Sequence, residues 1–171
     1  MTSQIITFQG NPLHLQGNNT PRVGDVAPDF TVLKNDLTPA SLHDYTGKGK
    51  VLVISSVPSL DTGVCNACTK RFNESLRGAQ VLTISADLPF AQARWAAKEI
   101  PNSHHVECFS DHKDLDFATK YGLHIRELRL CARAVFVIDK TGHIRYAQVV
   151  PEMTDHPDYE AIYAAVAEAN Q

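Results

Sequence analysis

The chain has 171 residues, with 16 Lys and Arg against 19 Asp and Glu, and a formal net charge of −3. Hydrophobic residues make up 43 % and charged residues 20 %. These values are typical of a soluble globular domain, and they exclude a disordered tail, a collagen-like repeat and nucleic-acid binding through bulk positive charge. The length predicts one domain over residues 1–171, large enough to fold without metal or disulfide.

The start of the chain, its longest apolar stretches and its cysteines predict the cellular compartment of the protein. The first ten residues contain no Lys or Arg and no long apolar core, so we expect no secretory signal. No stretch approaches the roughly 20 apolar residues of a membrane helix, and we expect no membrane association. The four cysteines at positions 65, 68, 108 and 131 then predict redox chemistry or metal binding in a cytoplasmic protein with reduced thiols.

Hydrophobic patterning predicts alternating strands and helices after an N-terminal hairpin within residues 1–16. The hairpin strands 4–8 and 13–15 flank a turn at Gly10-Asn11-Pro12, and residues 27–33 look extended. The last helix should begin near Pro157, capped by Thr154 or Asp155. The other predicted elements are strands 51–56, 81–86, 104–110, 134–139 and 143–150, and helices 65–77, 90–99 and 113–121.

This order predicts one mixed sheet, parallel in its first part, with an antiparallel hairpin near its end and helices on both faces. The run VLVISS at 51–56 is apolar almost throughout, as expected for a strand covered on both faces. The arrangement is compatible with a thioredoxin-like α/β fold. A fold of this kind does not by itself identify a function.

Cys65 occupies the most informative position, because it follows a buried strand and opens a predicted helix. A thiol there meets the positive end of the helix dipole and unpaired backbone N–H groups, which favour the nucleophilic thiolate. Pro58 and Thr62 precede it in a loop that must fold over the sulfur. A proline there can shield the thiol from water, and a threonine hydroxyl can bind an incoming oxygen.

The residues Pro58, Thr62 and Cys65 match the peroxiredoxin active-site motif Pro-x-x-x-Thr-x-x-Cys. The chain resembles the thiol peroxidases, the atypical two-cysteine branch of that family, along almost its whole length. Beyond PSLDTGVC, the segments that carry the resemblance are ITFQGNP at 6–12, ISADLPFAQAR at 84–94, ARAVFVID at 132–139 and PDYEA at 157–161.

The resemblance implies a role for each matching residue. Cys65 would be the peroxidatic cysteine, whose thiolate attacks the peroxide O–O bond and becomes a sulfenic acid. Thr62 would orient the peroxide, and Arg133 would stabilise the thiolate and the developing oxyanion. The family also implies hydrogen peroxide and organic hydroperoxides as substrates, thioredoxin as the usual reductant, no cofactor, and a homodimer.

The sequence departs from this branch at the resolving cysteine, which the family carries in a context like Arg-Phe-Cys. Here that context reads Arg94-Trp95-Ala96. Cys68 is the nearest substitute, because residues i and i+3 share a helix face and form a Cys-x-x-Cys pair with Cys65. A purely structural role for Cys68 has similar weight, since buried cysteine also packs as a small hydrophobe.

Two other cysteines are weaker candidates for the resolving role. Cys131 lies two residues before Arg133, so the two side chains would share one side of a strand, although a structural role is favoured. Cys108 sits in a predicted strand and is expected to be structural. If none of the three resolves Cys65, an external thiol must do so in a one-cysteine mechanism.

Two alternative functions remain open at this point. A thiol–disulfide oxidoreductase could use Cys65 and Cys68 without peroxide, although thioredoxins face their Cys-x-x-Cys with a cis-proline and the corresponding region of this chain reads Cys131-Ala132-Arg133. A redox-sensing or zinc-binding interaction module could use the two cysteines with Cys108 and His112. The complete motif around Cys65 argues against zinc, and we predict no metal site.

Overall fold

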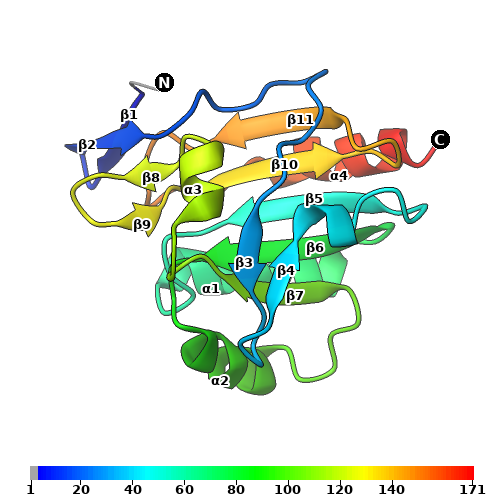
Figure 1. Cartoon of the computed structure of the whole chain (residues 1–171), viewed down its shortest axis with the longest axis horizontal. Helices are drawn as coiled ribbons and strands as arrows, with labels where there is room; N and C mark the ends of the chain where they lie inside the picture. The colour runs from blue at the N-terminus through cyan, green and yellow to red at the C-terminus, as the bar shows by residue number, and fades with distance from the viewer. Residues whose placement is uncertain (1–3) are drawn as a thin grey trace.

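A seven-stranded mixed sheet forms the centre of residues 4–171, which the computed structural model describes, and a four-stranded sheet lies beside it (Figure 1). The strands are β1 (Ile5–Phe8), β2 (Asn11–Gln16), β3 (Thr31–Leu33), β4 (Pro39–Ser41), β5 (Val51–Ser56), β6 (Ala79–Ser85), β7 (Val106–Ser110), β8 (His124–Ile125), β9 (Leu130–Cys131), β10 (Ala134–Ile138) and β11 (Ile144–Val149). The helices are α1 (Gly63–Ser75), α2 (Pro89–Glu99), α3 (Asp116–Lys120) and α4 (Tyr159–Ala169), with the 3₁₀ turn η1 (Leu42–Asp44).

The large sheet has the strand order β11-β10-β5-β6-β7-β3-β4. Strands β5, β6 and β7 are parallel, whereas β10 is antiparallel to β5 and to β11. This pattern confirms the expected mixed sheet of a thioredoxin-like fold, with the antiparallel hairpin near its end. The central strand β5 is buried at all six positions, as its apolar sequence predicts.

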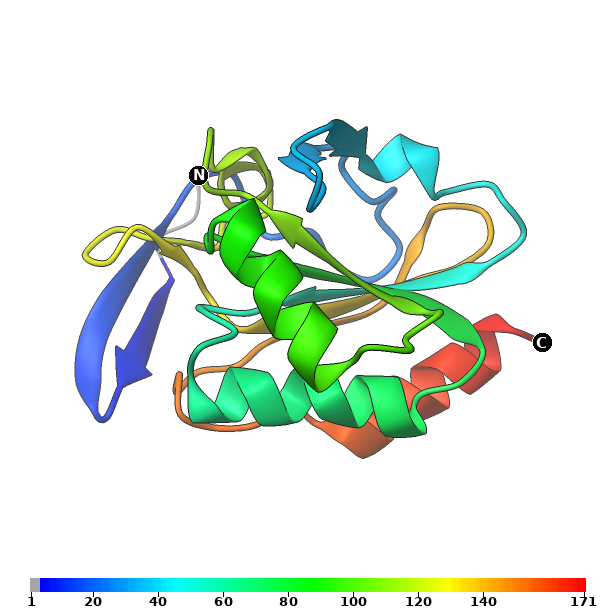
Figure 2. The same ribbon diagram turned by 90° about the horizontal axis from the view of Figure 1, so that it is seen from below.

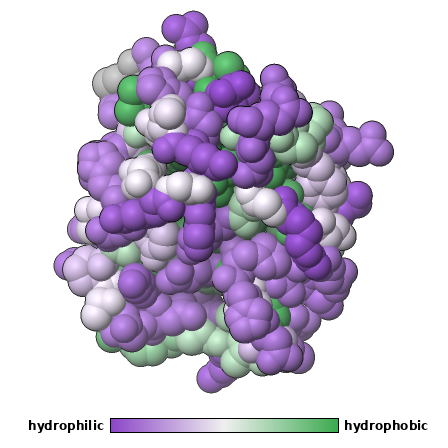
Figure 3. Space-filling view, turned by 90° about the vertical axis from the view of Figure 1, so that its right-hand side faces the viewer, coloured by the Kyte–Doolittle hydropathy of each residue, from purple (hydrophilic) through white to green (hydrophobic). Residues whose placement is uncertain are grey.

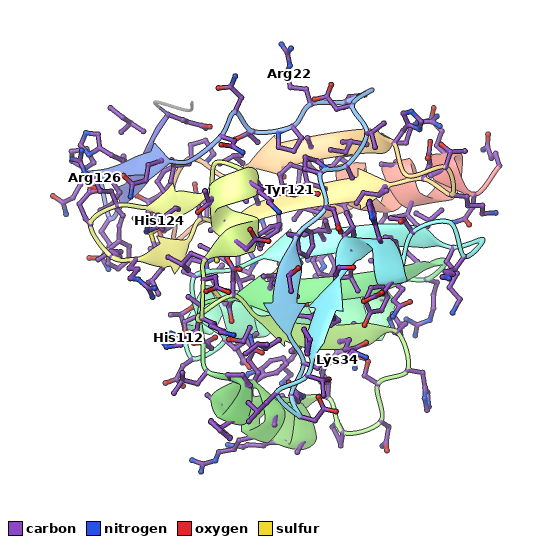
Figure 4. The ribbon with its side chains drawn as sticks, in the orientation of Figure 1. Arg22, Lys34, His112, Tyr121, His124 and Arg126 are labelled. Carbon is purple, nitrogen blue, oxygen red and sulfur yellow. The ribbon has the colours of Figure 1, made fainter. Side chains whose placement is uncertain are left out.

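Alternate residues of β5 point to two separate halves of the core. Val51 and Val53 pack in one half with residues of α1 and α4, and Leu52 and Ile54 pack in the other with residues of α3. Figure 2 shows α1 and α4 together on one face of the sheet. On the opposite face Tyr121, labelled in Figure 4, packs edge-on against Phe136 of β10 at 5.2 Å between ring centroids.

The N-terminal hairpin is confirmed, but its turn is not where the sequence placed it. The turn residues are Gln9 and Gly10, with φ of 50° and 82°, while Asn11 and Pro12 already belong to β2. A two-residue turn with positive φ at both positions matches the twist of the strands it joins, and glycine tolerates this conformation at little cost. Strands β8 and β9 extend the hairpin and were not predicted.

Helices α1 to α4 all begin at residues other than those expected, and α2 begins one residue before and α3 three residues after the predicted start. Helix α1 begins at Gly63, two residues before the predicted start. Helix α4 is capped by Asp158, whose side chain accepts a hydrogen bond from the Ala161 N–H, rather than by Thr154 or Asp155. Thr154 and Asp155 instead form hydrogen bonds with Glu152. The Thr154 N–H and hydroxyl donate to the Glu152 carboxylate, and the Asp155 N–H donates to the Glu152 backbone carbonyl.

The surface at the amino ends of the parallel strands, beside the C-terminal end of α4, is mostly hydrophilic (Figure 3). This face lies opposite to the end of the sheet at which β5 leads into α1 (Figure 1). Among residues 4–171, no helix combines the length and apolar character needed to cross a bilayer.

Glu152 fastens the N-terminal hairpin to the segment that follows β11. Its carboxylate accepts hydrogen bonds from the Thr7 hydroxyl and the Gly10 N–H at 2.9 Å, and from the Thr154 N–H at 2.8 Å. The neighbouring Met153 N–H donates to the Thr7 carbonyl at 2.8 Å. The N–H groups of Thr154 and Gly10 are the main cause that lowers the pKa of Glu152 to about 2.

We predict that Glu152→Gln destabilises the protein in a pH-dependent way. A lowered folded pKa gives stability that is complete above the ordinary value of 4.5 and is lost as the pH falls toward about 2. The difference in melting temperature between wild type and Glu152→Gln should therefore be largest near neutral pH and clearly smaller near pH 3.5. A gap that does not change with pH would contradict this role of the Glu152 charge.

Candidate active site

Cys65 lies in the first turn of α1, directly beyond the carboxyl end of β5. Helix α1 has Thr62 as its N-cap residue, so Cys65 is the third residue of the helix. The first backbone N–H groups of a helix have no partner within it, and the helix dipole is positive at this end. Figure 2 shows this end of α1 on the same side of the molecule as the β1–β2 hairpin. The Cys65 side chain is 0 % exposed.

Arg133 reaches Cys65 from the start of β10. Its Nη2 donates to the Cys65 Sγ at 3.3 Å, and Nε and Nη2 both donate to the Met153 carbonyl, at 3.3 and 2.9 Å. The Ser56 hydroxyl donates to the Ala132 carbonyl at 2.7 Å and so fixes the backbone beside the arginine. The guanidinium is thus held at the sulfur from two sides.

The charge of Arg133 is buried without a carboxylate partner. The residue is 3 % exposed, and none of the ion pairs formed within residues 4–171 includes it. Its Nη1 is also buried and has no hydrogen-bond partner. Because a buried charge is costly unless it is paired, this site is complementary to an anion at the sulfur or at a bound oxygen.

The loop between β5 and α1 carries the other two motif residues. Pro58 is buried, whereas Thr62 is exposed and its hydroxyl donates to the Ser59 carbonyl at 2.9 Å. The Thr62 side chain makes no capping hydrogen bond to the first turn of α1. The Asp87 carboxylate holds the loop, because it accepts from the Ser59 hydroxyl at 2.7 Å and from the Leu60 N–H at 2.8 Å.

A cavity of about 610 Å³ opens beside the first turn of α1, between the loop and α2. Thr62, Asn66 and Trp95 are among its lining residues. The Trp95 indole N–H donates to the Asn66 side-chain oxygen at 2.8 Å, so this tryptophan joins α2 to α1 next to Cys65. Ala96, the residue at the family's usual resolving position, lies half-buried on α2 and packs against the core beneath α1 and α4.

Cys68 lies one turn further along α1 and is 1 % exposed. It packs in the half of the core formed with α4, whereas Cys65 packs with Val57, Leu60 and Cys108. Burial raises the pKa of the Cys68 thiol to about 11, while the Tyr159 hydroxyl and the charge of Arg133 act in the opposite direction. Both sulfurs of the Cys-x-x-Cys pair are thus under the influence of Arg133.

Cys131 does not share the side of Arg133 that the strand pattern predicted. Its thiol donates to the Asp111 carboxylate at 3.9 Å, within the other half of the core. The strand pattern does not apply here because β9 ends at Cys131 and β10 begins only at Ala134, so the two-residue alternation is interrupted between them. Burial, and next the Asp111 charge, raise the pKa of Cys131 well above its usual value.

Cys108 lies on β7 and belongs to the small apolar cluster that contains Cys65. Burial and then the charge of Asp87 raise the pKa of its thiol to about 12. Its strand is paired with β6 along its full length, which fixes the backbone at this position. Cys108 is therefore close to the site in packing, but its surroundings oppose a thiolate.

The residues that support the site were not predicted from the sequence. Asp87 could have been recognised as an acidic residue at the carboxyl end of a predicted strand, where loop residues gather. Met153 acts through its backbone carbonyl, and a main-chain acceptor leaves no signal in the residue type. Within residues 4–171, no three His, Cys, Asp or Glu side chains cluster as a metal site requires, and His112 lies at the surface (Figure 4).

Comparison with known proteins agrees with this geometry. The Redoxin family matches residues 22–163. The chain is 55 % identical over 166 residues to a thiol peroxidase of Halalkalibacterium halodurans, covering 95 % of this chain and 97 % of that protein. It is 54 % identical over 158 residues to the thiol peroxidase of Bacillus subtilis, covering 91 % and 92 %.

Solved structures show the same likeness. A peroxiredoxin-like protein from Aquifex aeolicus superposes with a TM-score of 0.85 at 40 % identity, covering 98 % of both chains. A thiol peroxidase from Chromobacterium violaceum superposes with a TM-score of 0.84 at 21 % identity, covering 98 % of this chain and 97 % of that one, and supports the fold alone. These relatives do not favour the oxidoreductase or zinc-module alternatives. The chain belongs to the redoxin family and is a thiol peroxidase of the peroxiredoxin type.

Proposed function

We propose that this thiol peroxidase reduces hydrogen peroxide and organic hydroperoxides at Cys65, within a single catalytic domain formed by residues 1–171. The observation that carries the proposal is the buried Arg133 guanidinium 3.3 Å from the Cys65 sulfur, with no carboxylate to balance it. A thiolate at Cys65 supplies the missing negative charge. The unpartnered Nη1 of Arg133 is a remaining donor for a peroxide oxygen.

The first chemical step transfers one oxygen atom from the peroxide to Cys65. The thiolate attacks the nearer peroxide oxygen, an S–O bond forms and the O–O bond breaks. The leaving oxygen takes up a proton and departs as water or an alcohol, and the sulfur, oxidised by two electrons, becomes a sulfenic acid. Thr62 orients the peroxide at the mouth of the site, and Pro58 shields the sulfur from water.

We predict that Cys65→Ser abolishes peroxide consumption, because a serine hydroxyl is a far weaker nucleophile than a thiolate at neutral pH. Turnover of hydrogen peroxide and of cumene hydroperoxide with a dithiol reductant measures this. The matched control is Cys131→Ala, which removes a buried thiol on the far side of the sheet and should leave turnover within about two-fold of wild type. Retained activity in Cys65→Ser would overturn the assignment of Cys65.

Both the charge and the shape of the Arg133 side chain should affect the rate at which Cys65 reacts with peroxide. We predict that Arg133→Gln lowers the second-order rate constant of Cys65 with hydrogen peroxide by about 100-fold or more, the loss typical when a preorganised donor to a developing anion is removed. Arg133→Lys keeps the positive charge but loses the forked donors of the guanidinium. Its rate constant should lie between those of wild type and Arg133→Gln. The fluorescence of Trp95, the only tryptophan of the chain, can follow single-turnover oxidation.

The control for this series is Arg145→Gln, which removes an exposed arginine of β11 paired with Asp139. It should react with peroxide at the wild-type rate. An Arg133→Gln protein that folds, by circular dichroism, and reacts as fast as wild type would show that the guanidinium is not part of the reaction.

We propose further that Cys68 resolves the sulfenic acid in place of the cysteine missing at Ala96. The i, i+3 spacing places the two Cβ atoms about 5–6 Å apart, and a disulfide requires about 3.5–4.5 Å, so only the first turn of α1 must rearrange. Arg133 acts favourably on the Cys68 thiolate, whereas Asp87 opposes a thiolate at Cys108. Cys131 is committed to Asp111.

Peptide mapping after one equivalent of peroxide distinguishes the candidates. Trypsin releases residues 51–70 as one peptide that contains both Cys65 and Cys68. We predict that this peptide becomes lighter by two hydrogen atoms, and that Cys68→Ser prevents the change. A cross-link between 51–70 and 99–113 would identify Cys108, a cross-link to 130–133 would identify Cys131, and a persistent sulfenic acid would indicate the one-cysteine route; each outcome contradicts the role of Cys68.

The reductant and the assembly are also proposals. A dithiol reduces a Cys65–Cys68 disulfide through one mixed disulfide that its own second thiol resolves, and we propose thioredoxin in the cytoplasm as this donor, supported by four cysteines that are all free thiols in the structure. Turnover with glutathione but not with thioredoxin would contradict this.

We propose a homodimer because Leu88 and Phe90, at the start of α2, are 46 % and 65 % exposed. A monomer mass by light scattering would contradict it.

A further inference from the structure

A chain of polar groups leads from the buried Cys68 thiol to solvent, and the peroxide step does not use it. Tyr159, in the first turn of α4, packs with Cys68 in the same half of the core, and its hydroxyl lowers the pKa of that thiol against the effect of burial. The same hydroxyl lies 2.6 Å from the His156 Nδ1. Cys68 is 1 % exposed and Tyr159 8 % exposed, whereas His156 is exposed. The three groups therefore join the core to the surface in order.

The Tyr159 ring is held firmly in this position. The Arg71 guanidinium lies over its face, 4.0 Å from the ring centroid, and Phe72 packs against it edge-on at 5.7 Å. Both residues come from α1, the helix that carries Cys68. The ring thus keeps its position beside Cys68 as long as α1 and α4 remain packed, and its hydroxyl stays at the His156 ring.

The protonation of Tyr159 suits a group that passes a proton on. Burial, and next the neighbouring Cys68, raise the pKa of its hydroxyl above its usual value, so the phenol stays neutral at physiological pH. A neutral hydroxyl can accept a hydrogen bond from the thiol and donate one to the His156 Nδ1 at the same time. The charged groups that act on this ring are Arg71 from α1 and Arg133, which directly precedes β10.

Cys68 needs such a path because only the thiolate is nucleophilic. Cys68 is 1 % exposed and packs among residues of the sheet, α1 and α4, so bulk solvent cannot take the thiol proton directly. Ser55, the other hydroxyl that acts on it, is also buried and has no solvent-exposed partner to continue the path. Among the groups that the structure places at the thiol, Tyr159 alone connects to an exposed base.

We propose that Tyr159 and His156 form a proton relay that activates Cys68 for the resolving step, an inference that rests on the proposed role of Cys68. The thiol proton passes to the Tyr159 oxygen as the hydroxyl proton passes to His156 Nδ1. The thiolate then attacks the sulfur of the Cys65 sulfenic acid, an S–S bond forms and the S–O bond breaks. Hydroxide leaves and takes up a proton as water, so no further oxidant or reductant is needed.

In this step Tyr159, which packs beside Cys68, takes the thiol proton, whereas His156 acts through the Tyr159 hydroxyl and is a positioning residue. The relay serves resolution only. Removing either residue should leave the reaction of Cys65 with peroxide unchanged and slow the formation of the disulfide. If the two residues had only a structural role, their removal would not slow disulfide formation while leaving the peroxide reaction unchanged.

The experiment is a rapid-quench time course of the reduced protein mixed with one equivalent of hydrogen peroxide. Alkylation at each time point and mass analysis of peptide 51–70 give the thiol, sulfenic acid and disulfide forms separately. We expect Tyr159→Phe and His156→Ala to form the sulfenic acid within about two-fold of the wild-type rate. Disulfide formation should slow by about 100-fold, the usual contribution of general acid–base catalysis. Added imidazole should restore much of the rate in His156→Ala.

The matched controls are Tyr146→Phe and His143→Ala, which remove the same groups from β11 and the turn before it, where they contact Gln148 and Thr141. Both should resolve at the wild-type rate. Disulfide formation at the wild-type rate in Tyr159→Phe, or no rescue of His156→Ala by imidazole, would overturn the relay alone. A wild-type protein that forms no Cys65–Cys68 disulfide would overturn the role of Cys68 and the relay with it.

Discussion

The charge of Arg133, buried beside the Cys65 sulfur, is the interaction around which the rest of the structure is arranged. A guanidinium cannot lose its proton at physiological pH, so the fold must supply partners for it or bear the cost of an unpaired charge. Here the fold supplies one backbone carbonyl and one sulfur. The negative charge that is still missing is supplied when Cys65 ionises or when an oxyanion develops on a bound peroxide. The same buried guanidinium therefore affects both the stability of the fold and the reaction at Cys65.

Each part of the fold near this charge serves to hold it. The parallel strand β5 delivers the loop and α1 to one end of the sheet, and the antiparallel β10 brings Arg133 to the same end. The Met153 carbonyl is placed by the segment after β11, which Glu152 and Thr7 fasten to the N-terminal hairpin. The hairpin, which lies far from Cys65 in the sequence, thus contributes to the position of the guanidinium.

The sequence predicted most of the large sheet and the motif residues, because long apolar strands and a dense motif leave clear signals. Strands of two or three residues, such as β8 and β9, are too short to show a period and were missed. The interruption between Cys131 and Ala134 could not be read from alternation, and it turned Cys131 away from the site. Met153 and the path through Tyr159 depend on contacts between distant elements, which residue types alone do not reveal.

The coupling between Arg133 and Cys65 can be measured directly by a double-mutant cycle on the reduced protein. The free energies of unfolding in urea at pH 7 are compared for wild type, Cys65→Ala, Arg133→Met and the double variant. We predict that the double variant is less destabilised than the sum of the single variants by about 1 kcal/mol or more, as for other hydrogen bonds to charged groups. Effects that add to within about 0.5 kcal/mol would contradict it, because the guanidinium and the sulfur would then be energetically independent.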